Sequence, residues 1–502
     1  MLSIVKTISL FGIVGSIIEV QVDISAGIPN WEMVGMLDKS IQESKERIKI
    51  AIKNSGIRIP SKKISINLAP AEIRKEGTSF DLAITVGILQ NLGVVQAENE
   101  EVVYIGEISY DGAVKSVNGI LPMCLEAKKL GIKKVYVPYE NIKEATLVKD
   151  LEIIGIKTLK NIIEKSNLVI LKNNQKIKEN EFNIDMSEVI GQEKVKRALE
   201  ISAAGEHSII LVGSPGVGKT MLAKRAITIF PELNYEETLE VMKINSILGN
   251  IKDSLEISRP FIEINPNITL NAFIGGGRYP MPGAVSLANL GILFMDEFPE
   301  FDRNKINLLK NILDTKCIKL DRVSGSALYP SKFVLIAAMN PCPCGYYASN
   351  IKECICSKNK IKNHLSKIGK AILDRIDLQV NVKKVDYKLI SKTQVCEKSK
   401  DIKARVKQAR KIQIERYKKD GILTNSELNS NQIKKYCVLN KETTEFIKEL
   451  YIKMGLSVRS YNNILKVSRT IADLNYKENI DIQCIAEAIQ YRSLEKLYKE
   501  GM

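Results

Sequence analysis

The sequence predicts an α/β fold built from three consecutive parts. Between residues 186 and 383, short apolar runs alternate with amphipathic segments, which is the pattern of a parallel sheet covered by helices on both faces. From Val385 the apolar residues recur with helical spacing, so a helical C-terminal domain is expected over 384–502. Residues 1–171 mix strand and helix patterns and are expected to form an α+β domain. The polar stretch 172–185 is expected to be a linker.

Positive charge is unevenly distributed along the chain. The 502 residues carry 74 Lys and Arg against 58 Asp and Glu, a formal net charge of +16. Residues 384–502 contain 25 basic and 15 acidic side chains and so hold +10 of this excess. A basic surface attracts polyanions such as nucleic acids. A lysine-rich surface that only favours solubility would give the same count.

Nothing in the sequence predicts membrane insertion or secretion. No apolar stretch reaches the ~18 residues needed to cross a bilayer. The apolar run Ile8–Ile18 is interrupted by Gly12 and Gly15 and lacks a small-residue cleavage site, so it is not expected to be a signal peptide. The nine cysteines are an odd number and mostly scattered. We therefore expect a cytoplasmic protein with reduced thiols and no membrane partner.

One motif predicts an ATP site in the middle of the chain. The apolar run His207–Val212 is expected to be a buried strand, and the residues from Met221 onward have helical character. The loop between them follows the pattern G-x-x-x-x-G-K-S/T, whose main-chain N–H groups surround phosphates. Lys219 is expected to pair with the β- and γ-phosphates, and Thr220 to bind Mg²⁺. The predicted phosphate-binding loop is Gly213, Ser214, Pro215, Gly216, Val217, Gly218, Lys219 and Thr220.

Two further apolar strands end in polar residues suited to ATP hydrolysis. The run Gly291–Met295 is followed by Asp296 and Glu297, a Walker B pattern that gains weight after a P-loop. Asp296 is expected to hold the Mg²⁺ shell and Glu297 to polarise the attacking water. The run Phe333–Met339 ends at Asn340, whose amide is expected to orient that water; alternatively, Asn340 only starts the next turn.

Two arginines are candidates for stabilising charge on the γ-phosphate in the transition state. Arg375 lies in Leu373–Asp377, just before another apolar run, and Arg459 lies at the predicted start of a helix. In many ATPases a neighbouring subunit supplies such an arginine finger. Either residue could instead form an ordinary surface ion pair.

Four cysteines fall within fifteen residues, in the loop 342–356 after Asn340. They are Cys342, Cys344, Cys354 and Cys356. Four thiolates can hold Zn²⁺ tetrahedrally and pin this loop, although the C-x-C spacing is tighter than the commoner C-x₂-C. Reduced thiols without metal are the alternative. His364 is expected to be a surface residue rather than a further ligand.

A basic helix is expected over Lys400–Lys419, which contains nine basic and two acidic residues. Its apolar positions at helical spacing are Ile402, Val406, Ala409 and Ile412. The opposite face is either a site of sequence-independent, salt-sensitive phosphate contact or a solvated helix surface.

These motifs together resemble the YifB/ComM family of magnesium-chelatase-like AAA+ proteins over essentially the whole chain. The segments that carry the resemblance, besides the P-loop, are Glu188–Leu199, Ile274–Gly283, Phe294–Phe301, Ala338–Gly345, Leu373–Asp377 and Ser457–Asp473. The sequence departs from the family pattern at Glu206, where Gly is expected, and at His364, where a basic or aromatic residue is expected.

The resemblance implies a P-loop AAA+ core with a helical C-terminal lid domain. It implies an inserted element around Ile274–Leu290 and a hairpin around Cys317–Lys332, both facing a central pore. It implies that Asn340 is sensor 1, Arg375 the arginine finger and Arg459 sensor 2. It further implies a homo-hexameric DNA helicase that drives branch migration during natural transformation.

The first domain resembles the ribosomal-S5-like fold shared with Lon protease domains. The matching stretches are Arg74–Leu82 and Tyr104–Val114, and Ser79 falls where Lon enzymes carry the nucleophile. A serine hydroxyl needs a base, and Leu121 stands where the lysine base should be. We therefore expect no peptidase activity.

Two classes of function remain open. One is an ATP-driven ring motor that translocates on DNA in uptake and recombination. The other is a chelatase-like or chaperone-like ATPase that remodels a protein partner.

Overall fold

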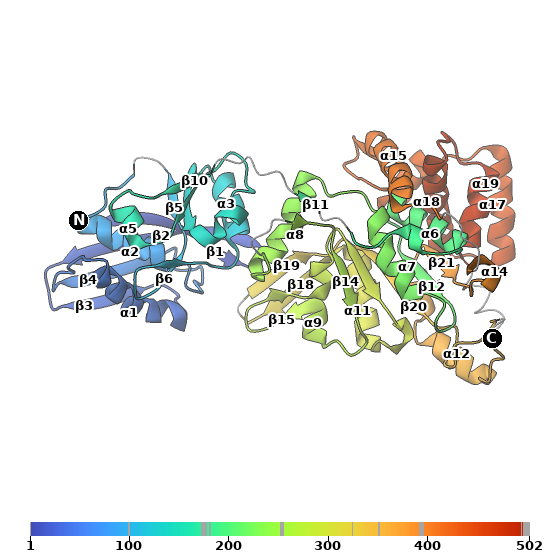
Figure 1. The fold of residues 1–502 in the computed structure, drawn as a ribbon, viewed down its shortest axis with the longest axis horizontal. Coiled ribbons are helices and arrows are strands. Elements are labelled where there is room, and N and C mark those ends of the chain that lie inside the picture. Colours follow the sequence, from blue (N-terminus) through green and yellow to red (C-terminus); the bar gives the residue numbers. More distant parts are fainter. Residues whose placement is uncertain are drawn as a thin grey trace.

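The computed structural model of the chain describes residues 2–98, 101–171, 178–179, 182–251, 256–323, 325–349, 352–390, 396–492 and 494. Figure 1 shows three parts along the long axis: an N-terminal part at the left, a central sheet and a C-terminal group of helices at the right. Most of the predicted linker, residues 172–177 and 180–181, lies outside the described residues.

The N-terminal part is a mixed sheet with helices packed on it. The strand order is β10-β9-β8-β5-β1-β2-β4-β3. Helix α2 is apolar on every side, and its residues Asp81–Leu89 are all buried, so it forms the centre of this core. The strands are β1 Ser3–Phe11, β2 Val14–Ser25, β3 Asn30–Val34, β4 Lys63–Ala69, β5 Val102–Tyr104, β6 Glu107–Ile108, β7 Val114–Lys115, β8 Lys134–Pro138, β9 Glu152–Ile156 and β10 Val169–Leu171. The helices are α1 Lys39–Asn54, α2 Asp81–Asn91, α3 Ile120–Lys129, α4 Ile142–Ala145 and α5 Leu159–Ile163.

The central part contains a five-stranded parallel sheet in the order β14-β17-β20-β12-β21. Its strands are β12 Ile209–Val212, β14 Phe261–Ile264, β17 Ile292–Met295, β20 Val334–Met339 and β21 Leu378–Asn381. Successive side chains enter two different cores: Ile209 and Leu211 face α6, whereas Ile210 and Val212 face the opposite layer. The predicted parallel sheet covered on both faces is therefore confirmed.

Helices and small hairpins surround this sheet. The helices are α6 Glu193–Gly205, α7 Lys219–Ala226, α8 Tyr235–Ile247, α9 Leu270–Ile274, α10 Ala284–Leu287, α11 Arg303–Thr315, α12 Lys358–Ser366 and α13 Lys370–Leu373, with short 3₁₀ turns at Met186–Glu188, Ile227–Ile229 and Phe298–Glu300. Strands β11 Lys178–Glu179 and β13 Glu256–Ile257 pair in parallel. Strands β15 Gly275–Gly276 and β16 Met281–Pro282 form one antiparallel hairpin, and β18 Cys317–Arg322 and β19 Gly325–Pro330 form the other, in the two segments where the sequence predicts an insert and a hairpin.

The C-terminal part is helical, as predicted. Its elements are α14 Tyr387–Ile390, α15 Ser399–Tyr417, a 3₁₀ turn at Asn425–Glu427, α16 Ser430–Tyr436, α17 Lys441–Met454, α18 Val458–Leu474 and α19 Ile482–Gln490. Helices α15 and α18 pack on α6 and share one apolar core with it. Within the residues described, every helix is too short or too polar to cross a bilayer.

Helix α8 joins the N-terminal part to the central part. Leu239 and Met242 of α8 are buried in the same apolar cluster as helix α3. At the end of α8, the Ser246 carbonyl accepts a hydrogen bond from the Gly119 N–H at 3.0 Å, and the Ser246 hydroxyl bonds the buried Glu144 carboxylate. The contact is thus both apolar and hydrogen-bonded.

A buried ion network joins the sheet to the C-terminal helices. Glu206, at the end of α6, has a positive φ of 58°, which explains why glycine is expected there. Its carboxylate lies 3.0 Å from Arg410 and 3.4 Å from Lys332. Burial alone would raise the pKa of Glu206, but the charges of Arg410, Lys332 and Arg259 outweigh burial and hold it far below its ordinary value of 4.5.

Replacement of Arg410 by Met should leave the Glu206 charge poorly compensated. It should lower the free energy of unfolding by about 3 kcal/mol, which would be measured as a lower thermal midpoint.

Because the folded-state pKa of Glu206 is depressed, the contribution of Glu206 to stability is present above pH ~4.5 and is lost as the pH falls. Glu206→Gln should therefore show a shallower loss of stability between pH ~5 and ~3. An equal acid dependence in both proteins would contradict this account.

Candidate nucleotide-binding site

The predicted phosphate-binding loop connects strand β12 to helix α7. Gly216 and Gly218 adopt φ angles of 77° and 94°, a region that residues with a Cβ rarely occupy. A Cβ on Gly213 would lie 2.5 Å from the Val382 carbonyl oxygen. The glycines are therefore required for the loop to turn tightly at the N-terminus of α7, where main-chain N–H groups can face an anion.

Lys219 and Thr220 open α7 and point toward neighbouring strand ends. The Lys219 ammonium donates to the Gly213 and Ser214 carbonyls at 2.7 and 3.1 Å and to Asn340 Oδ1 at 3.0 Å. The Thr220 hydroxyl donates to Asp296 Oδ2 at 2.8 Å. A hydroxyl and a carboxylate this close are a suitable pair of Mg²⁺ ligands.

Asp296 and Glu297 follow strand β17, as the sequence predicts. Asp296 Oδ1 also accepts the Glu297 N–H at 2.8 Å, and Glu297 has a φ of 51°. This turn leaves the Glu297 side chain exposed. It lines the same cavity as Lys219, Asp296 and Asn340.

The cavity has a volume of about 690 Å³, within the range of small-molecule sites. Burial lowers the pKa of Lys219, and the nearby Asp296 carboxylate only partly offsets this effect. A polyanionic ligand would restore the preference of Lys219 for its charged form.

Two further polar residues line this cavity, Glu263 and Asn265, and neither is predicted from the sequence. Both lie at the end of β14, and Glu263 forms an ion pair with Lys224 at 2.8 Å. The apolar pattern of β14 is only four residues long and contains a glutamate, so it gives a weak strand signal. Strand β14 lies in the sequence between the P-loop helix and the Walker B strand, and this position could have been used to predict it.

Arg375 and Arg459 lie together, away from this cavity. Two nitrogens of Arg375, Nε and Nη2, donate hydrogen bonds to the Asp314 carboxylate at 2.6–3.1 Å. Arg459 Nη2 donates to the same carboxylate at 2.6 Å. Burial alone would raise the pKa of Asp314, but the hydrogen bonds and charges of the two arginines lower it. The three side chains line a second cavity of about 270 Å³, which shares no lining residue with the first. Asp314 is not identifiable from sequence motifs, because it is the penultimate residue of an ordinary amphipathic helix.

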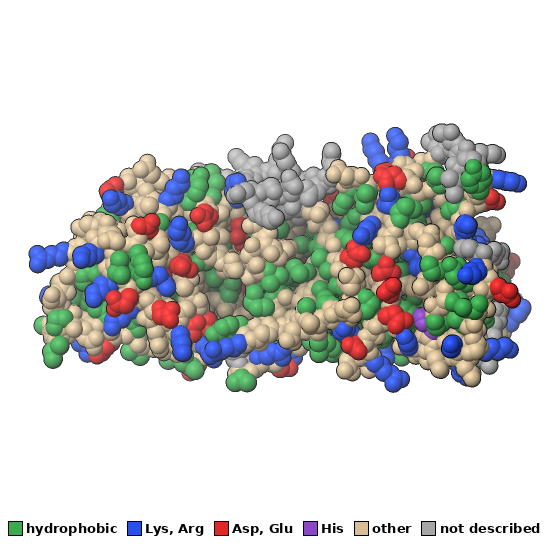
Figure 2. Space-filling view, turned by 60° about the horizontal axis from the view of Figure 1, so that its bottom comes forward, with side chains coloured by type: hydrophobic (Ala, Val, Ile, Leu, Met, Phe, Trp, Pro, Cys, Tyr) green, Lys and Arg blue, Asp and Glu red, His purple; other side chains and the backbone are tan. Residues whose placement is uncertain are grey.

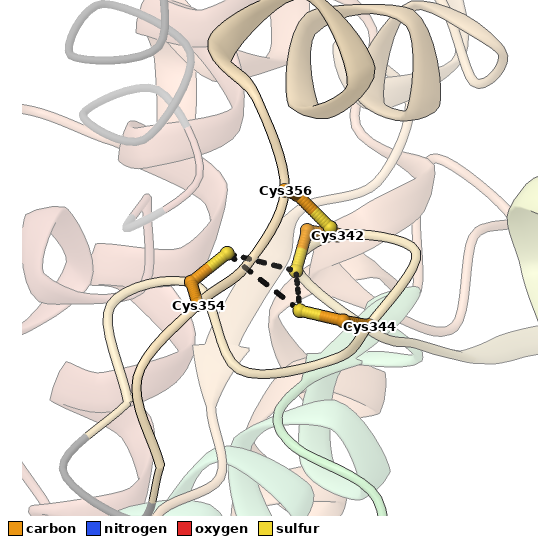
Figure 3. A group of neighbouring side chains, drawn as sticks. All are labelled: Cys342, Cys344, Cys354 and Cys356. Carbon is orange, nitrogen blue, oxygen red and sulfur yellow. Dashed lines mark hydrogen bonds between the residues drawn. The ribbon is translucent and has the colours of Figure 1, made fainter.

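The four cysteines converge after strand β20 (Figure 3). The Sγ atoms of Cys342, Cys344 and Cys354 are 3.4–3.7 Å apart. With Cys356, all four sulfurs lie within 4.8 Å of one another. None forms a disulfide. This arrangement fits a four-thiolate metal site of the kind the sequence predicts.

The prediction that His364 is a surface residue is wrong. His364 is buried, and its Nε2 lies 3.1 Å from the Asn340 carbonyl oxygen. Its helix, α12, begins just after the last cysteine, with Ser357 as N-cap, and its Ile361 and Leu365 share an apolar cluster with residues of β20. Burial lowers the pKa of His364, which favours the neutral imidazole.

Helix α15 buries Ile402, Val406 and Ala409, as predicted, but Gln413 is buried where Ile412 is expected and Ile412 is only half-buried. Five of its nine predicted basic residues form ion pairs within the chain; they are Lys403, Arg405, Lys407, Arg410 and Arg416. Figure 2 shows basic and acidic side chains interspersed over the face in view. Much of the charge of α15 is thus used in internal contacts.

Ser79 lies in a third cavity, of about 510 Å³, between the N-terminal part and the hairpins of the central part. Its polar neighbours there include Asp38, Glu76 and Glu107, and the described residues that line it include no lysine, arginine or histidine. Leu121 is buried in α3. The described surroundings of Ser79 thus offer carboxylates instead of the lysine base of a Lon-type dyad.

Three family profiles match successive regions of the chain. The profile described as magnesium chelatase, subunit ChlI, matches residues 185–390; that of subunit ChlI of Mg-chelatase matches residues 20–141; and that of the ChlI C-terminal region matches residues 396–492. The chain is also 31% identical over 169 residues to Lon protease 2 of Bacillus subtilis, a match that covers 30% of each protein.

Two similar proteins align along nearly their entire length. YifB of Salmonella typhimurium is 36% identical over 504 residues, covering 99% of this chain and 98% of YifB. Competence protein ComM of Haemophilus influenzae is 34% identical over 515 residues, covering 99% of both chains. With the magnesium-chelatase profiles and the P-loop fold, these full-length matches show that the chain belongs to the YifB/ComM family of magnesium-chelatase-like ATPases.

Proposed function

We propose that the protein is an AAA+ motor that hydrolyses Mg·ATP at the P-loop and acts as a ring, most simply a homo-hexamer, in the cytoplasm. The observation that carries the proposal is the meeting of Lys219, Thr220, Asp296, Glu297 and Asn340 around one cavity. Lys219 and the loop amides bind the phosphates, Thr220 and Asp296 hold Mg²⁺, and Asn340 and Glu297 orient the water that attacks the γ-phosphate.

Two substitutions should separate binding from hydrolysis. Lys219→Ala removes the ammonium that faces the phosphates and should weaken nucleotide binding itself. Glu297→Gln leaves the P-loop contacts intact, so it should bind ATP as the parent does but hydrolyse it at least ~100-fold more slowly. Equilibrium binding of a fluorescent ATP analogue and steady-state phosphate release measure the two effects. Full hydrolysis by Glu297→Gln would remove Glu297 from the mechanism.

We further propose that Arg375 and Arg459 act on the ATP of a neighbouring subunit. Their separation from the P-loop cavity of their own chain supports this assignment, because a finger used in cis would have to lie beside Lys219. In the isolated chain both guanidinium groups pair with the single carboxylate of Asp314, so one positive charge is left uncompensated by it. A neighbour's γ-phosphate would compete with Asp314 for them.

Mixed subunits test action in trans. Arg375→Ala and Glu297→Gln should each lose most activity alone, about 10³-fold for a missing arginine finger. In an equal mixture, about a quarter of the head-to-tail interfaces combine an intact site with an intact arginine, so activity should return in part. Arg303→Ala, an exposed arginine on the same helix as Asp314, is the matched control and should remain fully active. Absence of any recovery would show that Arg375 serves its own site.

We propose that the motor acts on DNA, as a helicase or branch-migration factor in DNA uptake and recombination. The support is the full-length similarity to a protein named for competence, together with the net charge of +16. The alternative is remodelling of a protein partner, which the magnesium-chelatase profiles favour. Whether the motor acts on DNA or on a protein, the N-terminal Lon-like part would be a non-proteolytic binding module.

Forked DNA should raise the ATPase rate, and the stimulation should decline steeply as salt rises, because phosphate contacts release counterions. The protein should also displace a labelled strand in an ATP-dependent manner, with Glu297→Gln as the inactive control. DNA sequence should matter little. Stimulation by a protein partner but not by DNA at any salt concentration would favour the remodelling function.

We also propose that Cys342, Cys344, Cys354 and Cys356 bind one structural Zn²⁺. A zinc ion with four sulfurs at ≈2.3 Å in tetrahedral geometry requires sulfurs about 3.8 Å apart. The three pairs among Cys342, Cys344 and Cys354 lie at 3.4–3.7 Å, near that spacing and far from the ~2.05 Å of a disulfide.

Elemental analysis of the purified protein should find about one zinc per chain. Cys354→Ser should lower this content, whereas Cys396→Ser, a half-buried cysteine outside the cluster, should keep it. Metal-free protein from zinc-replete cells would contradict the assignment.

A further inference from the structure

We propose that the four-cysteine loop is a metal-dependent clamp on the ATP site, so that Zn²⁺ binding and Mg·ATP binding strengthen each other. The nucleotide half of this inference rests on the proposed function. Throughout, the clamp means the described part of residues 341–357 with its four thiols, together with helix α12. Three contacts connect the clamp to three different parts of the ATP site.

The first contact joins the clamp to the P-loop. Gly345, between the two cysteine pairs, packs directly on Pro215: a Cβ built on Gly345 would lie 2.4 Å from Pro215 Cδ and 2.8 Å from its Cγ. Real side-chain carbons do not approach this closely, so only glycine allows the two loops to meet. Gly345 also has a φ of 83°, fixed by a turn in which its N–H donates to the Cys342 carbonyl at 2.9 Å. The turn that presents Gly345 to the P-loop is thus built by the metal-ligand segment itself.

The second contact joins the clamp to Asn340. His364 of α12 lies 3.1 Å from the Asn340 carbonyl oxygen, and Asn340 Oδ1 accepts the Lys219 ammonium at 3.0 Å. Because Cys356 immediately precedes the N-cap of α12, Ser357, the fourth thiol fixes the start of the helix that carries His364. The cysteine cluster is therefore connected, through α12 and His364, to the main chain of the residue whose amide meets Lys219.

The third contact joins the clamp to the Walker B turn. Lys367, just after α12, donates to the Glu300 carboxylate at 2.9 Å. Glu300 ends the 3₁₀ turn that follows Asp296 and Glu297. The end of α12 thus lies beside the segment that carries the proposed metal ligand and the proposed catalytic carboxylate, although this exposed ion pair is the weakest of the three contacts.

The clamp also forms part of a cavity wall beside the P-loop. Tyr347, Ala348 and Ser349 line a space of about 600 Å³ together with Gly213 and Ser214. The Tyr347 N–H donates to Cys342 Sγ at 3.4 Å, so this wall is hydrogen-bonded to a metal-ligand sulfur.

Coupling follows from how the clamp is held. Between Pro341 and Ser357 the described residues form neither helix nor strand, and Ile355, between two ligands, is 85% exposed. A long irregular segment lacks the regular backbone hydrogen bonds of a helix or strand that would offset its conformational entropy. A tetrathiolate metal cross-link supplies that order. Without the metal cross-link, Gly345 would no longer fix Pro215 and His364 would no longer fix Asn340. The binding of nucleotide would then have to order Pro215 and Asn340.

The test measures nucleotide affinity in the full-length protein with and without zinc. In excess Mg²⁺, a methylanthraniloyl-ATP analogue is titrated into zinc-loaded protein and into protein stripped by a chelator selective for zinc over magnesium. Zinc-free protein should bind the analogue about tenfold more weakly or worse, a typical coupling between two sites. By reciprocity, saturating Mg·ATP should reduce zinc loss to the chelator by the same factor at equilibrium.

Three variants make the test specific. Gly345→Ala keeps all four thiols but pushes the clamp off Pro215, so it should retain zinc and still bind the analogue about tenfold more weakly. Cys354→Ser should lower zinc content and affinity together, and Cys396→Ser should change neither. If the zinc-free chain unfolds, Gly345→Ala still carries the test, because its metal site is intact.

Equal affinity for the ATP analogue in zinc-loaded and zinc-free protein, or in Gly345→Ala and the parent, would contradict the coupling between the clamp and the ATP site. Purified protein without zinc would contradict the proposal that the clamp binds zinc. Failure of zinc-loaded parent protein to bind Mg·ATP would instead overturn the proposed ATPase site, so the two hypotheses fail on different measurements.

Discussion

The hydrogen bond between Thr220 and Asp296 is the contact on which the geometry of the candidate nucleotide site depends. It joins the first turn of α7 to the end of β17, two elements separated by 76 residues in the chain. It can form only because all five strands of the central sheet run parallel, so that their carboxyl ends meet at one edge. The P-loop, the Walker B turn and Asn340 all emerge at that edge. A change of strand order would leave the same motifs in the sequence but would disperse the site.

Much of the positive charge of this chain serves its own fold. The basic helix α15 directs Arg405 to Glu200, Arg410 to Glu206 and Arg416 to Asp473. The first two pairs attach α15 to helix α6 and its C-cap, and the third joins α15 to α18 within the C-terminal part. Buried acids need such partners, because removal from water is costly for an isolated charge. These pairs leave the formal excess of +16 unchanged, because each joins one basic side chain to one acidic side chain, but they hold these arginines in place within the fold.

The sequence was most informative where one short segment carries both the structure and the chemistry. The P-loop and the Walker B pair each join a buried strand to polar residues within a few positions, so the strands and the side chains could be predicted together. Asp314, Gly345 and His364 could not be found in this way, because their importance comes from partners 61, 130 and 24 residues away in the chain. The prediction that Ile412 of α15 is buried failed for a similar reason. Gln413 is buried in its place, and the Ala204 carbonyl of α6 accepts a hydrogen bond from the Gln413 side-chain amide at 3.1 Å.

The joint at helix α8 has a mechanical consequence. Leu239 and Met242 pack in the same apolar cluster as α3, while Ser246 bonds both Gly119 and Glu144, so two kinds of contact hold this joint. Helix α8 itself follows α7 by only a short connection. A displacement of α8 would therefore be passed directly to α3 and, through it, to the sheet of the N-terminal part.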